Sequence, residues 1–179
     1  MARIAFYTFG VLKATRDSEL LQDFWERFPS VFEKAERMEG FIDRSGYSQS
    51  ARVDDRPAWG DSVKPRFFIQ GIHADALATL SLWSDLESVS AFAYHGLHSE
   101  ALQKRKEWFL EPEWPTYVAW WVDDHHLPTW REGADQLERL VDDGPTKRAF
   151  DLVRPFDFSG EPTTVDREAV RVKWTAAER

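Results

Sequence analysis

The stretch RIAFYTFG, residues 3–10, is the strongest indication of the fold in this sequence. Side chains on a β-strand alternate between two sides, and in this stretch large apolar residues fall on both sides. A strand that is apolar on both faces is typical of the middle of a sheet. We therefore expect a central strand here, with one face formed by Ile4, Phe6 and Thr8 and the other by Ala5, Tyr7 and Phe9.

The chain that follows alternates between helical and strand-like patterns. Apolar residues at helical spacing predict helices over residues 18–38, 84–94, 98–109 and 129–143. Pro29 should kink or split the first, and Ser84 to Glu87 resembles a capping box at the start of the second. Strands are expected at residues 41–48, 76–83 and 116–122, with a short extra one at 66–69.

The order strand, helix, strand, strand, helix, strand predicts an α+β fold of the ferredoxin-like type. In this arrangement a four-stranded antiparallel sheet carries its helices on one face. If the other face is apolar, a second copy of the chain is expected to cover it, and we predict a homodimer.

A chain of 179 residues fits one domain. We expect residues 1–150 to form it, with a polar insertion at about 52–64 whose Trp59 would fold back as a lid. The helical and strand-like periodicity fades after Phe150. Residues 151–179 are therefore expected to form an arm across a partner or a loosely ordered tail.

The composition excludes several kinds of binding partner and several kinds of reaction chemistry. A net charge of −8 repels phosphate backbones and speaks against nucleic acid. The chain has no cysteine, which excludes disulfides, thiolate nucleophiles and cysteine-ligated metals. A signal-like N-terminus and a stretch of membrane-spanning length are both missing, so we expect a cytoplasmic protein without a membrane partner. No Gly-rich phosphate loop, G-x-S-x-G elbow or H-E-x-x-H zinc motif occurs.

Large rings are unusually frequent, with 9 Trp and 13 Phe. This is more ring surface than an ordinary core requires, so part of it is expected to line a small-molecule pocket. At strand and helix spacing such residues are more often plain core, which is the alternative for each of them. The candidate substrate-binding residues are Tyr7, Phe9, Trp83, Trp108, Trp121 and His126.

Three polar residues are the candidates for catalysis. His98 and Arg105 fall on one face of the helix predicted over 98–109. His98 would transfer a proton or ligate a haem iron, Arg105 would bind a carboxylate or an enolate oxygen, and Tyr94 would donate a proton. The alternatives are a histidine that caps its helix, and an ordinary ion pair of Arg105 with Glu36 or Glu87.

The run Asp123-Asp124-His125-His126 combines carboxylates with imidazoles, a donor set that suits zinc, iron or copper. Adjacent side chains diverge, however, and no distant further ligand accompanies the run. We interpret it as a solvated turn and predict no metal site.

Ordered motifs along the chain carry a family resemblance. They comprise the run 81–89 with Phe92, His98, Arg105 and 108–109, the downstream segments 120–122, 126–129, 137–140, 144–146 and 149–150, and the upstream segments 35–37 and 40–41. Together they resemble domain-of-unknown-function family 3291. The sequence departs from the family pattern at Phe32, where an asparagine is usual, and in the insertion at 52–64.

The resemblance implies a dimeric α/β barrel related to the antibiotic-biosynthesis monooxygenases, a superfamily that also contains haem-binding enzymes. We therefore expect an enzyme of specialised metabolism that acts on an apolar or aromatic metabolite by oxygenation, rearrangement or cyclisation, without a cofactor. The alternative is a haem enzyme of the same fold with His98 as axial ligand. A second alternative is a dimeric ligand-binding or scaffold protein without catalysis.

Overall fold

The computed structural model describes residues 2–47, 56–94 and 105–177. The strands are β1 (Arg3–Leu12), β2 (Phe41–Arg44), β3 (Asp75–Trp83) and β4 (Tyr117–Val122). The helices are α1 (Gln22–Arg37), which follows a short 3-10 turn at Glu19–Leu21, α2 (Leu86–Tyr94), α4 (Trp130–Asp143) and α5 (Arg167–Ala177). Helix α1 continues unbroken past Pro29. The expected alternation of helices and strands is thus confirmed across most of the chain.

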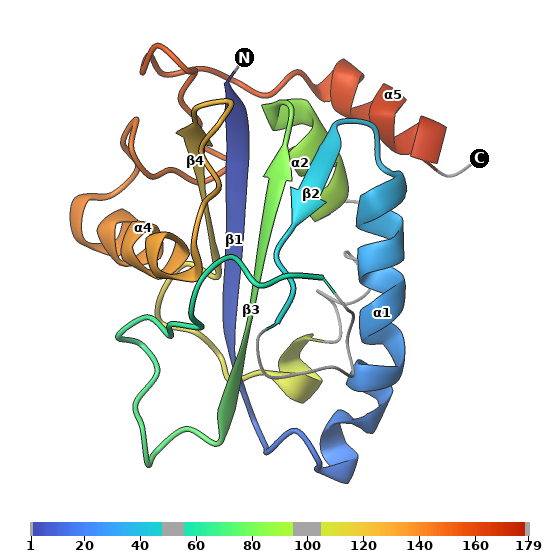
Figure 1. The fold of residues 1–179 in the computed structure, drawn as a ribbon, viewed down its shortest axis with the longest axis vertical. Helices are drawn as coiled ribbons and strands as arrows, with labels where there is room; N and C mark the ends of the chain where they lie inside the picture. The colour runs from blue at the N-terminus through green and yellow to red at the C-terminus, as the bar shows by residue number, and fades with distance from the viewer. Residues whose placement is uncertain (1, 48–55, 95–104, 178–179) are drawn as a thin grey trace.

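The strands form one four-stranded sheet in the order β2-β3-β1-β4, and every neighbouring pair is antiparallel (Figure 1). Strand β1 pairs with β3 on one side and with β4 on the other, so the prediction of a central strand at residues 3–10 is confirmed. Its register sets Thr8 opposite Thr79 of β3 and opposite Tyr117 of β4. The protein is an α+β protein with an antiparallel sheet.

The two faces of β1 bury different cores. On the side that we name the α1 face, Ile4 and Phe6 pack with residues of α1, α2 and α5. On the opposite side, the α4 face, Ala5, Tyr7, Phe9 and Val11 pack with apolar residues of α4. The prediction that the helices cover only one face is therefore wrong, because the apolar stripe of the helix at 130–143 is buried on the second face.

Helix α4 covers the α4 face of the sheet because its backbone approaches β1 closely at one glycine. Gly133 lies directly over the ring of Tyr7, and a Cβ atom added at Gly133 would come within 2.4 Å of a ring carbon. Thr129 and Glu132 form the predicted capping box that starts this helix. Since the chain itself fills the second face, the argument for a homodimer from an open apolar sheet no longer applies.

The segment before β3 joins the same core. Residues 66–69 form no strand, contrary to the prediction; Phe67 and Phe68 instead pack against the α4 face. Trp59 is buried among the same residues, and its backbone bonds to Ser45 and Trp130. The described part of the expected insertion, residues 56–64, is thus anchored in the core by Trp59.

The C-terminal segment folds back onto its own chain, where a loose tail or an arm across a partner was expected. Helix α5 packs on α2, and Val170 is buried in the core of the α1 face (Figure 1). Upstream of α5, Trp121 of β4 donates its indole N–H to the carbonyl of Phe156 over 2.7 Å. Described residues 151–177 thereby complete the core.

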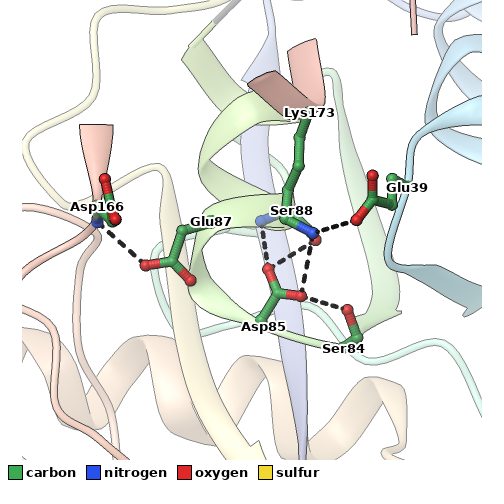
Figure 2. A network of polar contacts seen from close by, with 7 residues as sticks. All are labelled: Glu39, Ser84, Asp85, Glu87, Ser88, Asp166 and Lys173. Atoms are coloured by element: carbon green, nitrogen blue, oxygen red, sulfur yellow. Dashed lines mark hydrogen bonds and ion pairs between the residues drawn. The ribbon is translucent and has the colours of Figure 1, made fainter. Parts of the chain in front are cut away.

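A polar network joins α5 to α2 and to the end of α1 (Figure 2). The Lys173 ammonium lies 2.9 Å from a Glu39 carboxylate oxygen and 3.4 Å from one of Asp85, and its side chain is only 15% exposed. Asp85 accepts hydrogen bonds from the Ser88 backbone and hydroxyl, so Asp85 caps α2 instead of the predicted Ser84.

Charge and hydrogen bonding hold this network in its ionised form. Burial opposes the charge of Asp85, but hydrogen bonds from Ser84 and Ser88 and the ammonium of Lys173 lower the pKa of its carboxyl. Burial likewise opposes the charge of Lys173, but Glu39 and Asp85 raise the pKa of its ammonium. Glu87, expected in the capping box, accepts a hydrogen bond from the Asp166 backbone and so also fixes the start of α5.

None of the described helices combines the length and the apolar character needed to cross a membrane.

We predict that Gly133→Ala destabilises the protein by about 1 to 3 kcal/mol, because the new methyl group overlaps the buried ring of Tyr7. In an exposed helix the same change would stabilise by about 0.5 to 1 kcal/mol. Urea unfolding of the variant, with Asp135→Ala on the exposed side of α4 as control, measures the difference. A stabilised Gly133→Ala variant would contradict the close packing of α4.

We also predict that Lys173→Met lowers the free energy of unfolding by about 1 to 2 kcal/mol at neutral pH, since it leaves Asp85 without its cation. The pKa of Asp85 is lowered in the folded state, so its contribution is present above the unfolded value of about 4 and disappears as the pH falls further. The difference between variant and wild type should therefore shrink in acid. Arg171→Met, an exposed cation of the same helix, is the control; an equal loss there would contradict the role of Lys173.

Candidate functional site

A cavity of about 280 Å³ opens on the α1 face, between β1, β4, the last turn of α2 and the segment 105–116. Its wall is mostly apolar. The polar groups in it are few and come from separate elements, which is the usual composition of a small-molecule site. The lining residues are Phe6, Thr8, Phe9, Gly10, Val11, Leu77, Ala93, Tyr94, Arg105, Lys106, Phe109, Leu110, Glu111, Pro112, Thr116 and Tyr117. We name this space the outer cavity.

Gly10 makes room for one wall of the outer cavity. The ring of Phe109 lies close against Gly10, where an added Cβ atom would come within 2.6 Å of a ring carbon. Phe109 also forms a bridge with Leu12 and an edge-to-face contact with Phe24 of α1, with ring centroids 5.4 Å apart. The segment that carries Arg105 is thus joined to β1 by backbone hydrogen bonds and to α1 by ring contacts of Phe109 and Trp108 with Phe24.

Arg105 is the central polar residue of the cavity. It is half-buried, and within residues 2–47, 56–94 and 105–177 its guanidinium makes no ion pair and no hydrogen bond. The two carboxylates considered as partners are engaged elsewhere: Glu36 pairs with Arg44 and Arg56, and Glu87 binds the Asp166 backbone. A half-buried guanidinium without a protein partner can offer its N–H groups to an anionic ligand.

Two tyrosines form a hydrogen-bonded pair beside it. The hydroxyl groups of Tyr94 and Tyr117 lie 2.7 Å apart, and the Tyr117 oxygen also accepts a bond of 3.4 Å from the Leu152 backbone. Burial raises the pKa of Tyr117, and its bond with Tyr94 raises it further. Tyr117 is therefore held neutral at physiological pH, while Tyr94 is 45% exposed and connects the pair to solvent.

A second, inner cavity of about 150 Å³ lies between α1 and the sheet. Aromatic rings form much of its wall, and it shares Thr8, Leu77, Arg105 and Phe109 with the outer cavity. The Thr8 and Thr79 hydroxyl groups lie 2.6 Å apart there. Its lining residues are Thr8, Phe24, Phe28, Val31, Phe32, Ala35, Phe41, Arg44, Ser45, Tyr47, Leu77, Thr79, Leu80, Ser81, Phe92, Arg105 and Phe109.

The wall of the inner cavity contains Phe32, the position at which the family resemblance implies an asparagine. Phe32 lies in the inner cavity, with its ring 4.7 Å from that of Phe28 and 4.0 Å from the guanidinium of Arg44. Arg44 is itself buried and pairs with Glu36 over 2.9 Å. A phenylalanine at this position makes the inner wall apolar where the usual asparagine would make it polar.

The structure brings together some of the predicted site residues. Arg105 and Tyr94 line the outer cavity; Phe9 borders it as well, although its side chain is buried in the core of the α4 face. Trp108 lies next to it in the core, with its ring 5.2 Å from that of Phe24. His98 lies outside the described residues, so its predicted role stays a prediction.

The other candidates lie elsewhere. Trp83 is fully buried and donates to Ser81, and Trp121 contacts the C-terminal segment through Phe156 and Phe158. Tyr7 is buried under α4 on the opposite face of the sheet. These positions are those of core residues, which was the alternative interpretation.

His126 lies at the surface, where its ring bonds to Glu132 over 2.7 Å. The neighbouring run from Asp123 is held by Arg3, whose guanidinium donates to the backbone carbonyls of Asp123 and His126. Among the described residues no three His, Asp or Glu side chains gather as a metal would require. The run is a surface turn, as interpreted from the sequence.

The sequence interpretation did not identify three polar residues of the cavities as site residues. They are Thr8, Thr79 and Tyr117. Thr8 and Thr79 meet only through the register of β1 and β3, and Tyr117 was one of several tyrosines that the sequence did not distinguish. A polar residue inside an otherwise apolar strand was the one available signal for Thr8.

The fold and the cavities define an α+β protein with a largely apolar internal site that presents a single unpaired arginine among its described residues. The model of the family Domain of unknown function (DUF3291) matches residues 3–166, and the chain belongs to this family. Comparison with curated proteins and with solved structures gave no significant match.

We predict opposite effects of removing the two buried tyrosine hydroxyls. Tyr7 is fully buried and its hydroxyl has no hydrogen-bond partner among the described residues, so Tyr7→Phe should stabilise the protein by about 1 kcal/mol. Tyr117→Phe breaks two hydrogen bonds and should destabilise it by about 1 kcal/mol. Urea unfolding at pH 7 measures both, and a destabilised Tyr7→Phe variant would contradict this placement.

Tyr7 and Tyr117 also make the stability of the protein depend on pH. Burial raises the pKa of both Tyr7 and Tyr117 in the folded state. The unfolded chain therefore releases these protons first, and stability is complete below about pH 10 and falls as the pH rises above it. Each Phe variant should show a weaker decline than wild type in this range.

Proposed function

We propose that the protein is an enzyme that binds an apolar or aromatic metabolite with an anionic or enolisable oxygen in the outer cavity. The observation that carries this proposal is Arg105, a half-buried guanidinium in a largely apolar cavity, with no partner among the described residues. A scaffold protein whose aromatics only fill a core would leave no such space, and two cavities of about 280 and 150 Å³ speak against that alternative.

The reaction class is cofactor-independent oxygenation, rearrangement or cyclisation. The apolar walls formed by Phe6, Phe109 and Leu77 exclude water and strengthen every charge interaction inside. Arg105 stabilises negative charge as it develops on the substrate oxygen. The hydrogen-bonded pair of Tyr94 and Tyr117 moves a proton between the cavity and solvent, because both tyrosines line the cavity and Tyr94 is exposed.

A haem does not fit the described lining. Its iron takes a neutral histidine, a thiolate, a thioether or a phenolate as axial ligand. The described lining of the outer cavity holds no His, Cys or Met, and the raised pKa of Tyr117 disfavours the phenolate. The alternative with His98 as ligand stays a prediction, and the absorption spectrum of the purified protein near 400 nm tests it.

We further propose a ferredoxin-like fold for this protein. The element order β1, α1, β2, β3, α2, β4 and the strand order β2-β3-β1-β4 support a ferredoxin-like fold and a relation to the antibiotic-biosynthesis monooxygenases. A role in specialised metabolism follows from that relation. The homodimer is proposed on the family resemblance alone, and it would use a surface other than the α4 face, which α4 and Trp59 occupy.

We predict that phenylacetate, a carboxylate with one aromatic ring, binds with one molecule per chain in isothermal titration calorimetry. Arg105→Gln should weaken this binding about 10-fold or more, since it removes a charge-assisted hydrogen bond in a partly buried site. Arg171→Gln is the control, because Arg171 is an exposed cation of α5 that does not line the cavity. Equal weakening by both variants, or no binding by wild type, would contradict the proposed site.

A further inference from the structure

The outer and inner cavities meet at a polar junction. They share Thr8, Leu77, Arg105 and Phe109, so the two cavities adjoin at these four residues. Arg105 is the charged group of this shared set. A ligand oxygen bound to Arg105 would therefore lie between two spaces rather than at the end of one.

The inner cavity is built to hold an aromatic ring. Phe24, Phe28 and Phe32 of α1 line it in a chain of contacts, with ring centroids 5.4 and 4.7 Å apart. Its volume of about 150 Å³ is comparable to an apolar cavity that takes one benzene. The buried cation in its wall, Arg44, pairs with Glu36 over 2.9 Å.

The threonine pair adds a second polar contact at the junction. Thr8 lines both cavities, and its hydroxyl lies 2.6 Å from that of Thr79. In a pair of hydroxyls only one proton is used between the two oxygens, so the other hydroxyl proton remains for a further acceptor. A ligand oxygen at the junction can thus receive hydrogen bonds from Arg105 and from one threonine.

We propose that the substrate has two apolar arms on either side of its oxygen-bearing centre, with an aromatic ring in the inner cavity and the second arm in the outer cavity. This inference rests on the proposed function, because it places the reacting oxygen at Arg105. The substrate class is then a compound whose carboxylate, enolate or carbonyl group lies between two apolar groups, at least one of them a single ring.

Diphenylacetate and phenylacetate test this directly, since they share the carboxylate and differ by one ring. Diphenylacetate should bind about tenfold tighter than phenylacetate in calorimetry, because its second ring is buried. Val31→Trp fills the inner cavity from the half-buried face of α1 and should remove this advantage, so that the variant binds the two ligands with similar affinity. Val31→Phe is the milder variant, and thermal unfolding confirms that each is folded.

The outcomes separate the two proposals. If phenylacetate binds through Arg105 but the second ring gives no gain, or if both Val31 variants weaken the two ligands equally, the two-armed substrate is wrong and the proposed site stands. If neither ligand binds, or Arg105→Gln changes neither affinity, the proposed function itself is overturned. A tenfold gain that only the inner-cavity variants remove supports the inference.

Discussion

The side chains on both faces of β1 are buried, so helices of the same chain must cover each face of the sheet. Ile4 and Phe6 on one face and Tyr7 and Phe9 on the other supply the apolar surface. Helices α1, α2 and α5 cover the first face and α4 covers the second. The α1 face also holds the cavities, because Thr8 and Gly10 follow Ile4 and Phe6 on it without filling the space.

The local signals of the fold could be predicted from the sequence. The alternation in residues 3–10 gave a central strand, and Thr129 with Glu132 marked the start of a helix. The placement of that helix could not be predicted, because it depends on Gly133 meeting Tyr7, residues that are distant in the chain. Asp85 and Ser84 are both good capping residues, and the structure distinguishes them because Asp85 accepts the hydrogen bonds of Ser88 and contacts Lys173.

In the candidate site, too, local features could be predicted from the sequence and tertiary contacts could not. Arg105 could be predicted from its helical spacing to His98, and Tyr94 from its place at the end of the preceding helix. The aromatic candidates could not be sorted, since Trp83 and Tyr7 have the same pattern as Phe9, and only the tertiary structure places them in the core or in the cavity wall. Thr8 and Thr79 are 71 positions apart and meet through strand register alone.

The central claim is that Arg105 holds its charge in the cavity for a ligand oxygen. A crystal structure of the protein grown with diphenylacetate tests it most directly. We expect the carboxylate within hydrogen-bond distance of the Arg105 guanidinium, with one ring among Phe24, Phe28 and Phe32 and the other in the outer cavity. A structure in which Arg105 pairs with a carboxylate of the protein and side chains fill both cavities would contradict it.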